Sequence, residues 1–255
     1  MITSLTNPKI KNVILLRNKS KARREQGAYI VEGIRMFSEI PAELILEVYM
    51  TGDFYNRYET NRKSSYHVEI VSDDVFSKMS DTVTPQGVIA VVKMQQYTLK
   101  DVMSGGFVLL LENIQDPGNL GTLFRTAEGA GVTGVIMSKG TADIYNTKVT
   151  RSTMGSIFRM PYYYIEDIKM AISQMQKADY TIYAAALEGA VDYTTASYVD
   201  NIGILIGNEG NGLNKDTIEA AGNSVFIPMQ GQVESLNASI SGAVLMYEAA
   251  RQRRQ

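Results

Sequence analysis

The segment Asn113-Ile-Gln-Asp-Pro-Gly-Asn-Leu-Gly-Thr-Leu-Phe-Arg125 directly follows a continuous apolar run, Phe107-Val-Leu-Leu-Leu111. Such a run is typical of a strand that is buried on both faces of a parallel sheet. Asp116, Pro117 and Gly118 form a turn signal, and Asn119 can cap the helix predicted over residues 120–130. The segment is therefore predicted to join a buried strand to a helix at the edge of a sheet where ligands bind.

Two later segments have the same character. Gly207-Asn-Glu-Gly-Asn-Gly-Leu213 follows a second apolar run, and Pro228-Met-Gln-Gly-Gln-Val-Glu-Ser-Leu-Asn-Ala-Ser239 follows a third. Gly, Pro and Asn allow sharp turns and a close approach of the backbone to a ligand. Because the carboxyl ends of parallel strands lie at one edge of a sheet, we expect the three segments to form one site.

The chain from residue 107 to residue 255 is predicted to be an α/β domain with a parallel sheet covered by helices on both faces. Its apolar runs predict strands at residues 107–111, 134–137, 181–185, 203–206 and 224–227. Helices are predicted at residues 120–130, 167–177, 215–221 and 236–253.

Residues 1–96 are predicted to form a smaller α/β domain, with residues 97–106 as a linker. A helix is expected within residues 1–24, and Asn7-Pro8 can begin it. Strands are predicted at residues 28–31, 44–49, 68–71 and 87–92, with helices near 35–40 and 73–79.

Composition excludes several kinds of site. The 255 residues contain no Cys and a single His, His67, so a zinc–thiolate site, a disulfide and a catalytic triad are all poor interpretations. We expect no bound metal. The first residues contain no signal-like apolar segment, and no stretch has the length of a membrane span, so a cytoplasmic protein without membrane contact is expected.

Charged residues offer candidate phosphate contacts. Lys21, Arg23 and Arg24 belong to a basic N-terminal cluster, which indicates either an RNA contact or a solvated helix face. Lys148 and Arg151 accompany several hydroxyl residues, a composition that fits a phosphate site or merely a helix start.

The three loops carry candidate polar groups of their own. Arg125 lies near the positive end of a helix and needs an anionic partner, either Glu128 or a ligand phosphate. Glu209 could bind a ribose hydroxyl, a cationic group or Arg125. Ser235, Asn237 and Ser239 exceed what capping one helix requires, which favours a ligand contact.

The three segments together resemble the motifs of the SpoU (TrmH) class of RNA ribose methyltransferases within the SPOUT superfamily. Asn113, Asp116–Asn119, Gly121 and Arg125–Ala127 match the first motif. The second motif matches without a gap, and the third matches with Ala238 where the family often has Val. Residues 1–96 resemble, more loosely, the ribosomal-protein-like RNA-binding domain of many members.

The resemblance implies a C-terminal SPOUT domain with a deep trefoil knot that holds S-adenosylmethionine, and it implies a homodimer. The residues at cofactor-binding positions are Gly207, Asn208, Glu209, Ile227, Met229, Ser235 and Leu236. The residues at catalytic positions are Asn119, Arg125, Glu209, Ser235 and Asn237. Expected RNA contacts are Lys21, Arg23, Arg24, Arg125, Lys148 and Arg151.

The implied reaction is methylation of a ribose 2′-hydroxyl in RNA, with 23S ribosomal RNA favoured over transfer RNA. A non-catalytic RNA-binding or ribosome-assembly protein of the same fold is an alternative. A nicotinamide-dependent oxidoreductase is a weaker one, because the first loop lacks the leading glycine of a dinucleotide motif. The family account gives Arg125 a part in deprotonation, but a guanidinium is always protonated in proteins, which favours a phosphate clamp.

Overall fold

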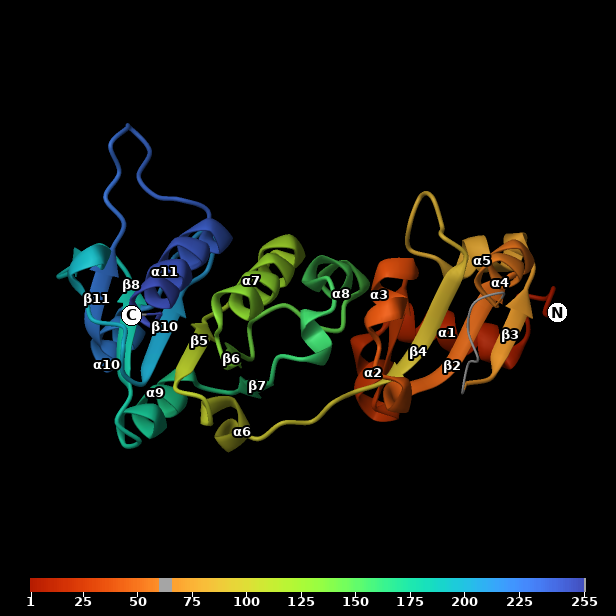
Figure 1. The fold of residues 1–255 in the computed structure, drawn as a ribbon, viewed down its shortest axis with the longest axis horizontal. Coiled ribbons are helices and arrows are strands. Elements are labelled where there is room, and N and C mark those ends of the chain that lie inside the picture. Colours follow the sequence, from red (N-terminus) through yellow and green to blue (C-terminus); the bar gives the residue numbers. More distant parts are fainter. Residues whose placement is uncertain (60–65, 255) are drawn as a thin grey trace. The chain divides into compact units, whose positions relative to one another are not determined.

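The computed structural model describes residues 1–59 and 66–254, and these residues form two compact units (Figure 1). Unit 1 contains Met1–Gln96 and Asp143–Phe158, and unit 2 contains Tyr97–Ala142 and the chain from Arg159 onward. The expected domain boundary at residues 97–106 does not fully describe this division, because residues 143–158, from the C-terminal half of the chain, belong to unit 1. A short helix, α6 (Leu99–Met103), also occupies the expected linker.

Unit 1 is built on a four-stranded sheet with the order β1-β4-β2-β3. Its strands are β1 (Ala28–Glu32), β2 (Ile45–Thr51), β3 (Val68–Val71) and β4 (Val88–Lys93), close to the predicted ranges. β4 runs antiparallel to both β1 and β2, whereas β3 runs parallel to β2. The helices of the unit are α1 (Pro8–Asn18), α2 (Ser20–Gln26), α3 (Ile34–Glu39), α4 (Gly52–Glu59), α5 (Asp73–Met79) and α8 (Thr147–Thr153).

The N-terminal helix is broken into two. Asn7 begins α1 as expected, and its side chain accepts a hydrogen bond from the Lys9 amide at 2.9 Å. Lys19 then adopts an extended conformation, with φ −125° and ψ 108°, and ends the first helix. The single helix expected over residues 1–24 is therefore wrong, because the break lets the two pieces bury different faces, Ile10 and Leu16 in α1 and Ala22 and Arg23 in α2.

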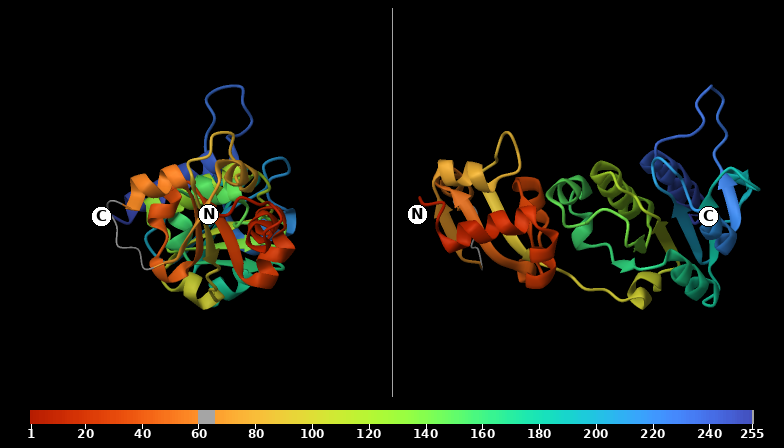
Figure 2. Two further views of the ribbon diagram at one scale, coloured as in Figure 1. Left: turned by 90° about the vertical axis from the view of Figure 1, so that its right-hand side faces the viewer. Right: turned by 180° about the vertical axis from the view of Figure 1, so that it is seen from behind.

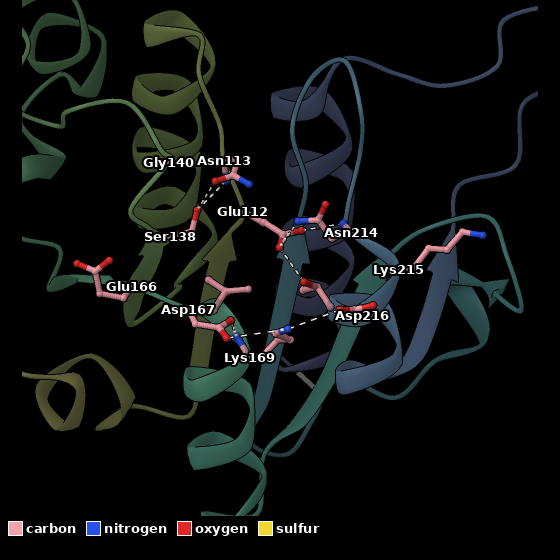
Figure 3. Close-up of a pocket in the computed structure, with 12 residues that line it drawn as sticks. Glu112, Asn113, Ser138, Gly140, Glu166, Asp167, Lys169, Asn214, Lys215 and Asp216 are labelled. Atoms are coloured by element: carbon pink, nitrogen blue, oxygen red, sulfur yellow. Dashed lines mark hydrogen bonds and ion pairs between the residues drawn. The ribbon is translucent and has the colours of Figure 1, made fainter.

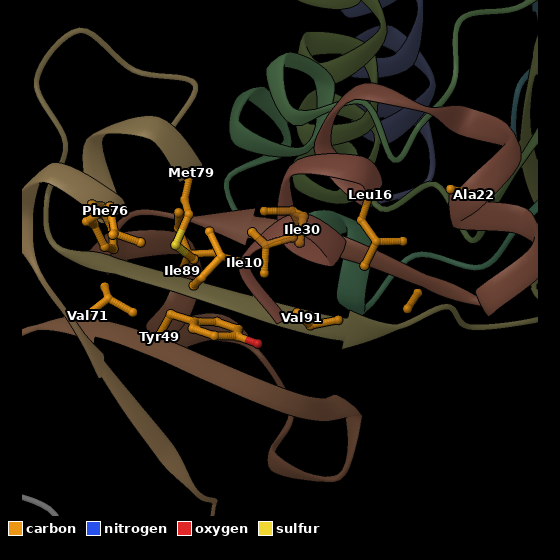
Figure 4. Close-up of a cluster of buried hydrophobic side chains, with 13 residues drawn as sticks. Ile10, Leu16, Ala22, Ile30, Tyr49, Val71, Phe76, Met79, Ile89 and Val91 are labelled. Carbon is orange, nitrogen blue, oxygen red and sulfur yellow. The ribbon is translucent and has the colours of Figure 1, made fainter. Parts of the chain in front are cut away.

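Helices α1 and α5 cover one face of the unit 1 sheet. Ile10, Leu16, Phe76 and Met79 pack there against Ile89 and other strand residues, and all five are almost fully buried (Figure 4). Burying each of these side chains stabilises the fold by about 1.5–3 kcal/mol. This apolar layer fixes the two helices against the sheet.

Residues 143–158 are held in unit 1 by charged and aromatic contacts. The buried guanidinium of Arg23 pairs with Asp143 at 2.5 Å, and Asp81 accepts from Thr147 at 2.7 Å. Arg151 lies between Asp81 at 3.3 Å and the buried Glu32 at 3.6 Å. The rings of Tyr29 and Tyr145 contact each other, with their centroids 4.5 Å apart.

Unit 2 is built on a seven-stranded, wholly parallel sheet with the order β7-β6-β5-β10-β8-β11-β9. Its strands are β5 (Phe107–Leu111), β6 (Gly134–Ser138), β7 (Tyr162–Ile165), β8 (Thr181–Ala185), β9 (Val191–Asp192), β10 (Ile202–Ile206) and β11 (Gly222–Phe226). The parallel sheet expected from the apolar runs is confirmed. The edge strands β7 and β9 were not predicted, because neither is a buried apolar run.

Helices cover both faces of the unit 2 sheet (Figure 2). On one face α7 (Pro117–Ala130) packs against α11 (Ala238–Gln252), and on the other lie α6, α9 (Ile168–Gln176) and α10 (Lys215–Ala221). Figure 1 also shows the chain between β11 and α11 extending away from the rest of the unit. The predicted helices are confirmed with small shifts of their ends. The connections after β5, β10 and β11 correspond to the three motif segments.

The pair Arg23–Asp143 gives a stability prediction. Asp143→Ala should lower the free energy of unfolding by about 3 kcal/mol, because the buried guanidinium loses its countercharge. Asp143→Asn, which keeps an acceptor oxygen, should cost less. Urea unfolding followed by circular dichroism measures both, and equal losses for the two variants would contradict the charge-based reason.

Candidate functional site

The first loop turns into α7 at Asp116. The Asp116 carboxylate accepts a hydrogen bond from the Asn119 amide at 2.8 Å, and Pro117 occupies the first helical position. The prediction that Asn119 caps the helix is therefore wrong. The helix begins at Pro117, which suits the first helical position because proline has no N–H that would be left unpaired there. The side chain of Asn119 is left available for another contact, although the residue is buried.

Glu209 of the second loop supplies that contact. Its carboxylate accepts from the Asn119 side-chain amide at 3.0 Å, from the Asp116 backbone N–H at 3.0 Å and from the Gln115 N–H at 3.1 Å. Of the partners that the sequence left open for Glu209, Arg125 does not contact it in the described part of the chain. The carboxylate instead binds N–H groups at the start of α7, where negative charge is favoured.

The hydrogen bonds change the acidity of Glu209. Partial desolvation raises the pKa of this carboxyl, but hydrogen bonds from Asn119 and from the Gln115 and Asp116 backbone outweigh it and hold the pKa below its usual value. Glu209 is therefore ionised at neutral pH, and an ionised carboxylate requires a donor from Asn119. The amide nitrogen of Asn119 must face Glu209, which leaves the Asn119 oxygen as an acceptor.

Asn208 makes a second link between the first two loops. Its side-chain nitrogen donates to the Asn113 carbonyl at 2.8 Å, and its oxygen accepts from the amides of Gly210 and Asn211 at 2.9 and 3.0 Å. Asn113 has a φ of 57° and donates its own N–H to Ser138 at 2.8 Å. The first and second loops thus form one hydrogen-bonded body at the carboxyl ends of β5 and β10.

The third loop ends at Asn237. The Asn237 side chain caps α11 and accepts from the Ser239 amide at 2.9 Å and the Ser239 hydroxyl at 2.7 Å. Asn237 is thus the one cap that the sequence required, and Ser235 remains exposed. Between this loop and the ends of β8 and β11 lies a cavity of about 110 Å³. Its lining includes Ile227, Met229, Ser235 and Leu236.

The expected site residues therefore fall into two groups. Asn119, Asn208 and Glu209 meet in the body formed by the first two loops, whereas Ile227, Met229, Ser235 and Leu236 line the third-loop cavity. Gly207, Asn208 and Glu209 are absent from the lining of that cavity. Within residues 1–59 and 66–254, no hydrogen bond joins the third loop to the other two.

A larger polar cavity, of about 450 Å³, lies at the same edge of the sheet (Figure 3). Glu112 projects toward Asn214, accepting from its backbone and side-chain nitrogens at 2.9 and 3.0 Å, and from the Thr217 hydroxyl at 2.7 Å. The sequence analysis missed Glu112. An acidic residue directly after a buried strand was the signal that could have found it.

Arg125 lies on the exposed surface of α7. Its nearby acid, Glu128, is bound instead by Arg159, whose second nitrogen lies 3.1 Å from the other carboxylate oxygen. Across the described residues Arg125 forms no hydrogen bond or ion pair. Of the two anionic partners expected for Arg125, Glu128 is thus paired with Arg159 instead.

The basic residues of unit 1 differ in their availability. Arg23 is only 4% exposed and is paired with Asp143, so its expected RNA contact is wrong. Arg151 is 29% exposed and already shared by two carboxylates. Lys21, Arg24 and Lys148 are exposed and remain candidates for RNA contact.

Comparison with known proteins gives the family. Residues 106–247 match the SpoU rRNA Methylase family, and residues 7–90 match the MRM3-like substrate binding domain. The chain belongs to the SpoU rRNA methylase family. A curated relative from Bacillus subtilis, the 23S rRNA (guanosine(2553)-2′-O)-methyltransferase RlmP, is 30% identical over 96% of this chain and 97% of its own.

Solved structures agree with this assignment. The AdoMet-bound rRNA methyltransferase from Sinorhizobium meliloti is 30% identical and aligns with a TM-score of 0.84 over 98% of this chain and 97% of its own. The SpoU methyltransferase AviRb from Streptomyces viridochromogenes, in complex with AdoMet, is 25% identical and has a TM-score of 0.87 over 98% and 99%. The SpoU assignment therefore extends to the whole fold.

The third-loop cavity suits S-adenosylmethionine in chemistry but not in size. Its wall is mostly apolar, formed by residues such as Leu187, Phe226 and Leu245, and Ser235 and Glu234 supply polar groups. These suit an adenine ring and the polar ends of the molecule. About 110 Å³ is below the roughly 300–1,000 Å³ of ligand pockets, so the cavity in this conformation is too small to enclose the whole molecule.

None of the helices in the described ranges is long and apolar enough to cross a bilayer.

The lowered pKa of Glu209 gives a pH prediction. Glu209 accepts its hydrogen bonds in the ionised form. The stabilisation of the fold by these hydrogen bonds is therefore fully present above about pH 4.3, the pKa of a free Glu. It is lost as the pH falls through the lower pKa that Glu209 has in the folded protein. Glu209→Gln should lower the free energy of unfolding by about 1 kcal/mol at neutral pH. Urea unfolding at a series of pH values should show that difference shrinking in acid.

Glu234→Gln is the matched control, because Glu234 lies on the exposed third loop. It should leave the free energy of unfolding unchanged at each pH. A Glu209→Gln difference that stays constant through the acid range would contradict the hydrogen-bonded, ionised state.

Proposed function

We propose that this chain transfers a methyl group from S-adenosylmethionine to a ribose 2′-hydroxyl of ribosomal RNA, in the 23S molecule. The observation that carries the proposal is the hydrogen bond from Asn119 to Glu209, which leaves an oriented acceptor oxygen at the expected catalytic position. The names of the relatives support ribosomal RNA as the substrate. A nucleotide substrate in 23S RNA implies action in the cytoplasm.

The residues of the first two loops would orient the hydroxyl. Bound S-adenosylmethionine supplies an electrophilic methyl group on a sulfonium. Asn119, its nitrogen held by ionised Glu209, can accept the hydrogen bond of the attacking 2′-hydroxyl through its oxygen. Glu209 therefore acts through Asn119 as a positioning residue. Such alignment supplies several kcal/mol of the barrier reduction or more.

Arg125 would bind the phosphate next to the target ribose. A guanidinium keeps its proton at neutral pH and is a poor general base. Placed on a phosphate, it stabilises negative charge that develops on the attacking oxygen. Its exposure and its lack of a partner in the described part of the chain fit this role. The phosphate or water would then take the hydroxyl proton.

The third loop would hold the methyl donor. Ile227, Met229 and Leu236 supply apolar contact and Ser235 a hydroxyl, in a cavity that a shift of the loop would enlarge. Gly207, which directly follows the buried strand β10, would contribute backbone contacts to the adenosine. Asn237 would keep the loop joined to α11. We propose the trefoil knot of the family for this C-terminal segment.

We propose that residues 1–96 bind the RNA substrate, that residues 107–255 form the methyltransferase domain, and that residues 97–106 connect them. We also propose a homodimer. Ile240 and Tyr247 on α11 are 49% and 50% exposed, and Val233 of the third loop is 61% exposed. Apolar side chains so close to the active loops suit contact with a second copy.

Ribose methylation of ribosomal RNA tests the proposed function. RNA from cells with and without the gene should differ by loss of one 2′-O-methyl group in 23S RNA, read by a method that maps such groups. Purified protein with S-adenosylmethionine should restore the group on unmodified 23S RNA. Restoration on transfer RNA alone would overturn the choice of substrate.

The clamp role of Arg125 predicts a specific kinetic change. Arg125→Ala should lower the single-turnover rate of methyl transfer by about 100-fold or more, because a charge interaction of the transition state is lost. The affinity for S-adenosylmethionine, measured by calorimetry, should stay nearly unchanged. Arg159→Ala is the control, since Glu128 already binds that guanidinium. An equal loss of cofactor binding in Arg125→Ala would contradict the clamp.

A further inference from the structure

We propose that a cavity in unit 1 binds one unpaired base of the RNA substrate. The cavity has a volume of about 540 Å³ and lies within the range matched by the substrate binding domain. Its lining residues are Ile34, Phe54, Arg57, Tyr58, Pro85 and Gln86. The inference rests on the proposed function, because that function makes RNA the molecule this unit meets.

The cavity has a rigid aromatic wall. The rings of Phe54 and Tyr58 are stacked with centroids 5.3 Å apart and an angle of 21° between their planes. Phe37 contacts Tyr58 edge-on at 5.7 Å and supports it from the core. Ile34 and Pro85 supply an apolar lining as well. An aromatic wall joined to apolar side chains suits a flat ring such as a nucleobase.

Two glycines leave room for Gln86 and Phe54 to lie close to the backbone. Gly33 has a φ of 95°, and a Cβ there would lie 2.9 Å from the Gln86 side-chain oxygen. Gly87 has a φ of 85°, and a Cβ there would lie 2.8 Å from the Cβ of Phe54. A side chain at either position would be strained and would displace a lining residue. The cavity is therefore built into the backbone of unit 1.

The polar groups of the cavity can donate hydrogen bonds. The Gln86 oxygen accepts from the Ile34 backbone N–H at 2.9 Å, which fixes the side-chain nitrogen as the outward donor. Arg57 is exposed and adds a planar cation. These groups match the carbonyl and ring-nitrogen acceptors of a base edge and the phosphate that follows it.

The base must be unpaired to enter the cavity. Within an RNA duplex the ring faces are covered by stacking and the base edges by pairing, whereas loops and bulges leave both available. The lining of the cavity supports such a contact, since its apolar residue Ile34 is 41% exposed. A base seated here would cover this apolar surface. Unit 1 would thus read a loop or bulge of ribosomal RNA.

A fluorescent base tests the proposal with the full-length protein. A short single-stranded RNA that contains 2-aminopurine should lose fluorescence on binding, because stacking on the aromatic wall quenches it. The chain contains no Trp, so protein emission interferes little. Tyr58→Leu, which removes the ring, should abolish the quenching, and Arg57→Ala, which changes an exposed residue, should weaken binding by about tenfold.

Three controls complete the design. Tyr58→Phe keeps the ring and should quench as the wild type does. Lys78→Ala removes an equal charge from the exposed surface of α5 and should keep both the quenching and the affinity. The same oligonucleotide paired in a duplex should not be quenched. With ribosomal RNA, Arg57→Ala should raise KM for RNA while kcat and cofactor affinity stay unchanged.

Quenching that survives in Tyr58→Leu, equal quenching of the duplex, or an equal loss of affinity in Lys78→Ala would each overturn the base pocket. Failure of the proposed function looks different. Methyl transfer would then be absent in the wild type, while the pattern of quenching across the variants would still hold.

Discussion

The carboxylate of Glu209 is the contact on which the arrangement of the first two loops depends. It binds two backbone N–H groups of the first loop and the side chain of Asn119, although these groups are about 90 residues apart in the chain. N–H groups at the start of a helix have no partners within the helix, and an anion is the best partner for them. The Glu209 side chain therefore supplies acceptors for the N–H groups at the start of α7, joins the first two loops and orients the Asn119 amide.

A second carboxylate makes similar contacts with the start of another helix at the same edge of the sheet. Glu112 is buried and binds the start of α10 through Asn214 and Thr217. The carboxyl ends of β5 and β10 lie where the helices change from one face of the sheet to the other, the usual ligand crevice of α/β folds. Here two glutamates of the chain occupy the N–H groups that would otherwise bind a phosphate. This agrees with a cofactor that carries no phosphate, such as S-adenosylmethionine.

The sequence predicted what depends on local patterns. The five inner strands of the parallel sheet followed from their apolar runs, and one cap was correctly expected among Ser235, Asn237 and Ser239. Contacts between residues far apart in the chain leave no local pattern in the sequence. Arg23 looked like a surface cation because its partner, Asp143, lies 120 residues away. The helix α4 spans only eight residues and begins at Gly52, a residue type that disfavours helices, so it was not predicted.

The docking of residues 143–158 in unit 1 has a consequence for how such proteins diversify. The chain passes between the units at residues 96–97, 142–143 and 158–159. A recombination event that exchanged only residues 1–96 would leave Asp143 and Arg151 facing foreign partners and would uncover the buried side chains of Ile144 and Val149. Residues 143–158 are therefore expected to evolve together with the N-terminal domain, although they lie inside the methyltransferase sequence. Among relatives these residues should covary with Arg23, Glu32 and Asp81.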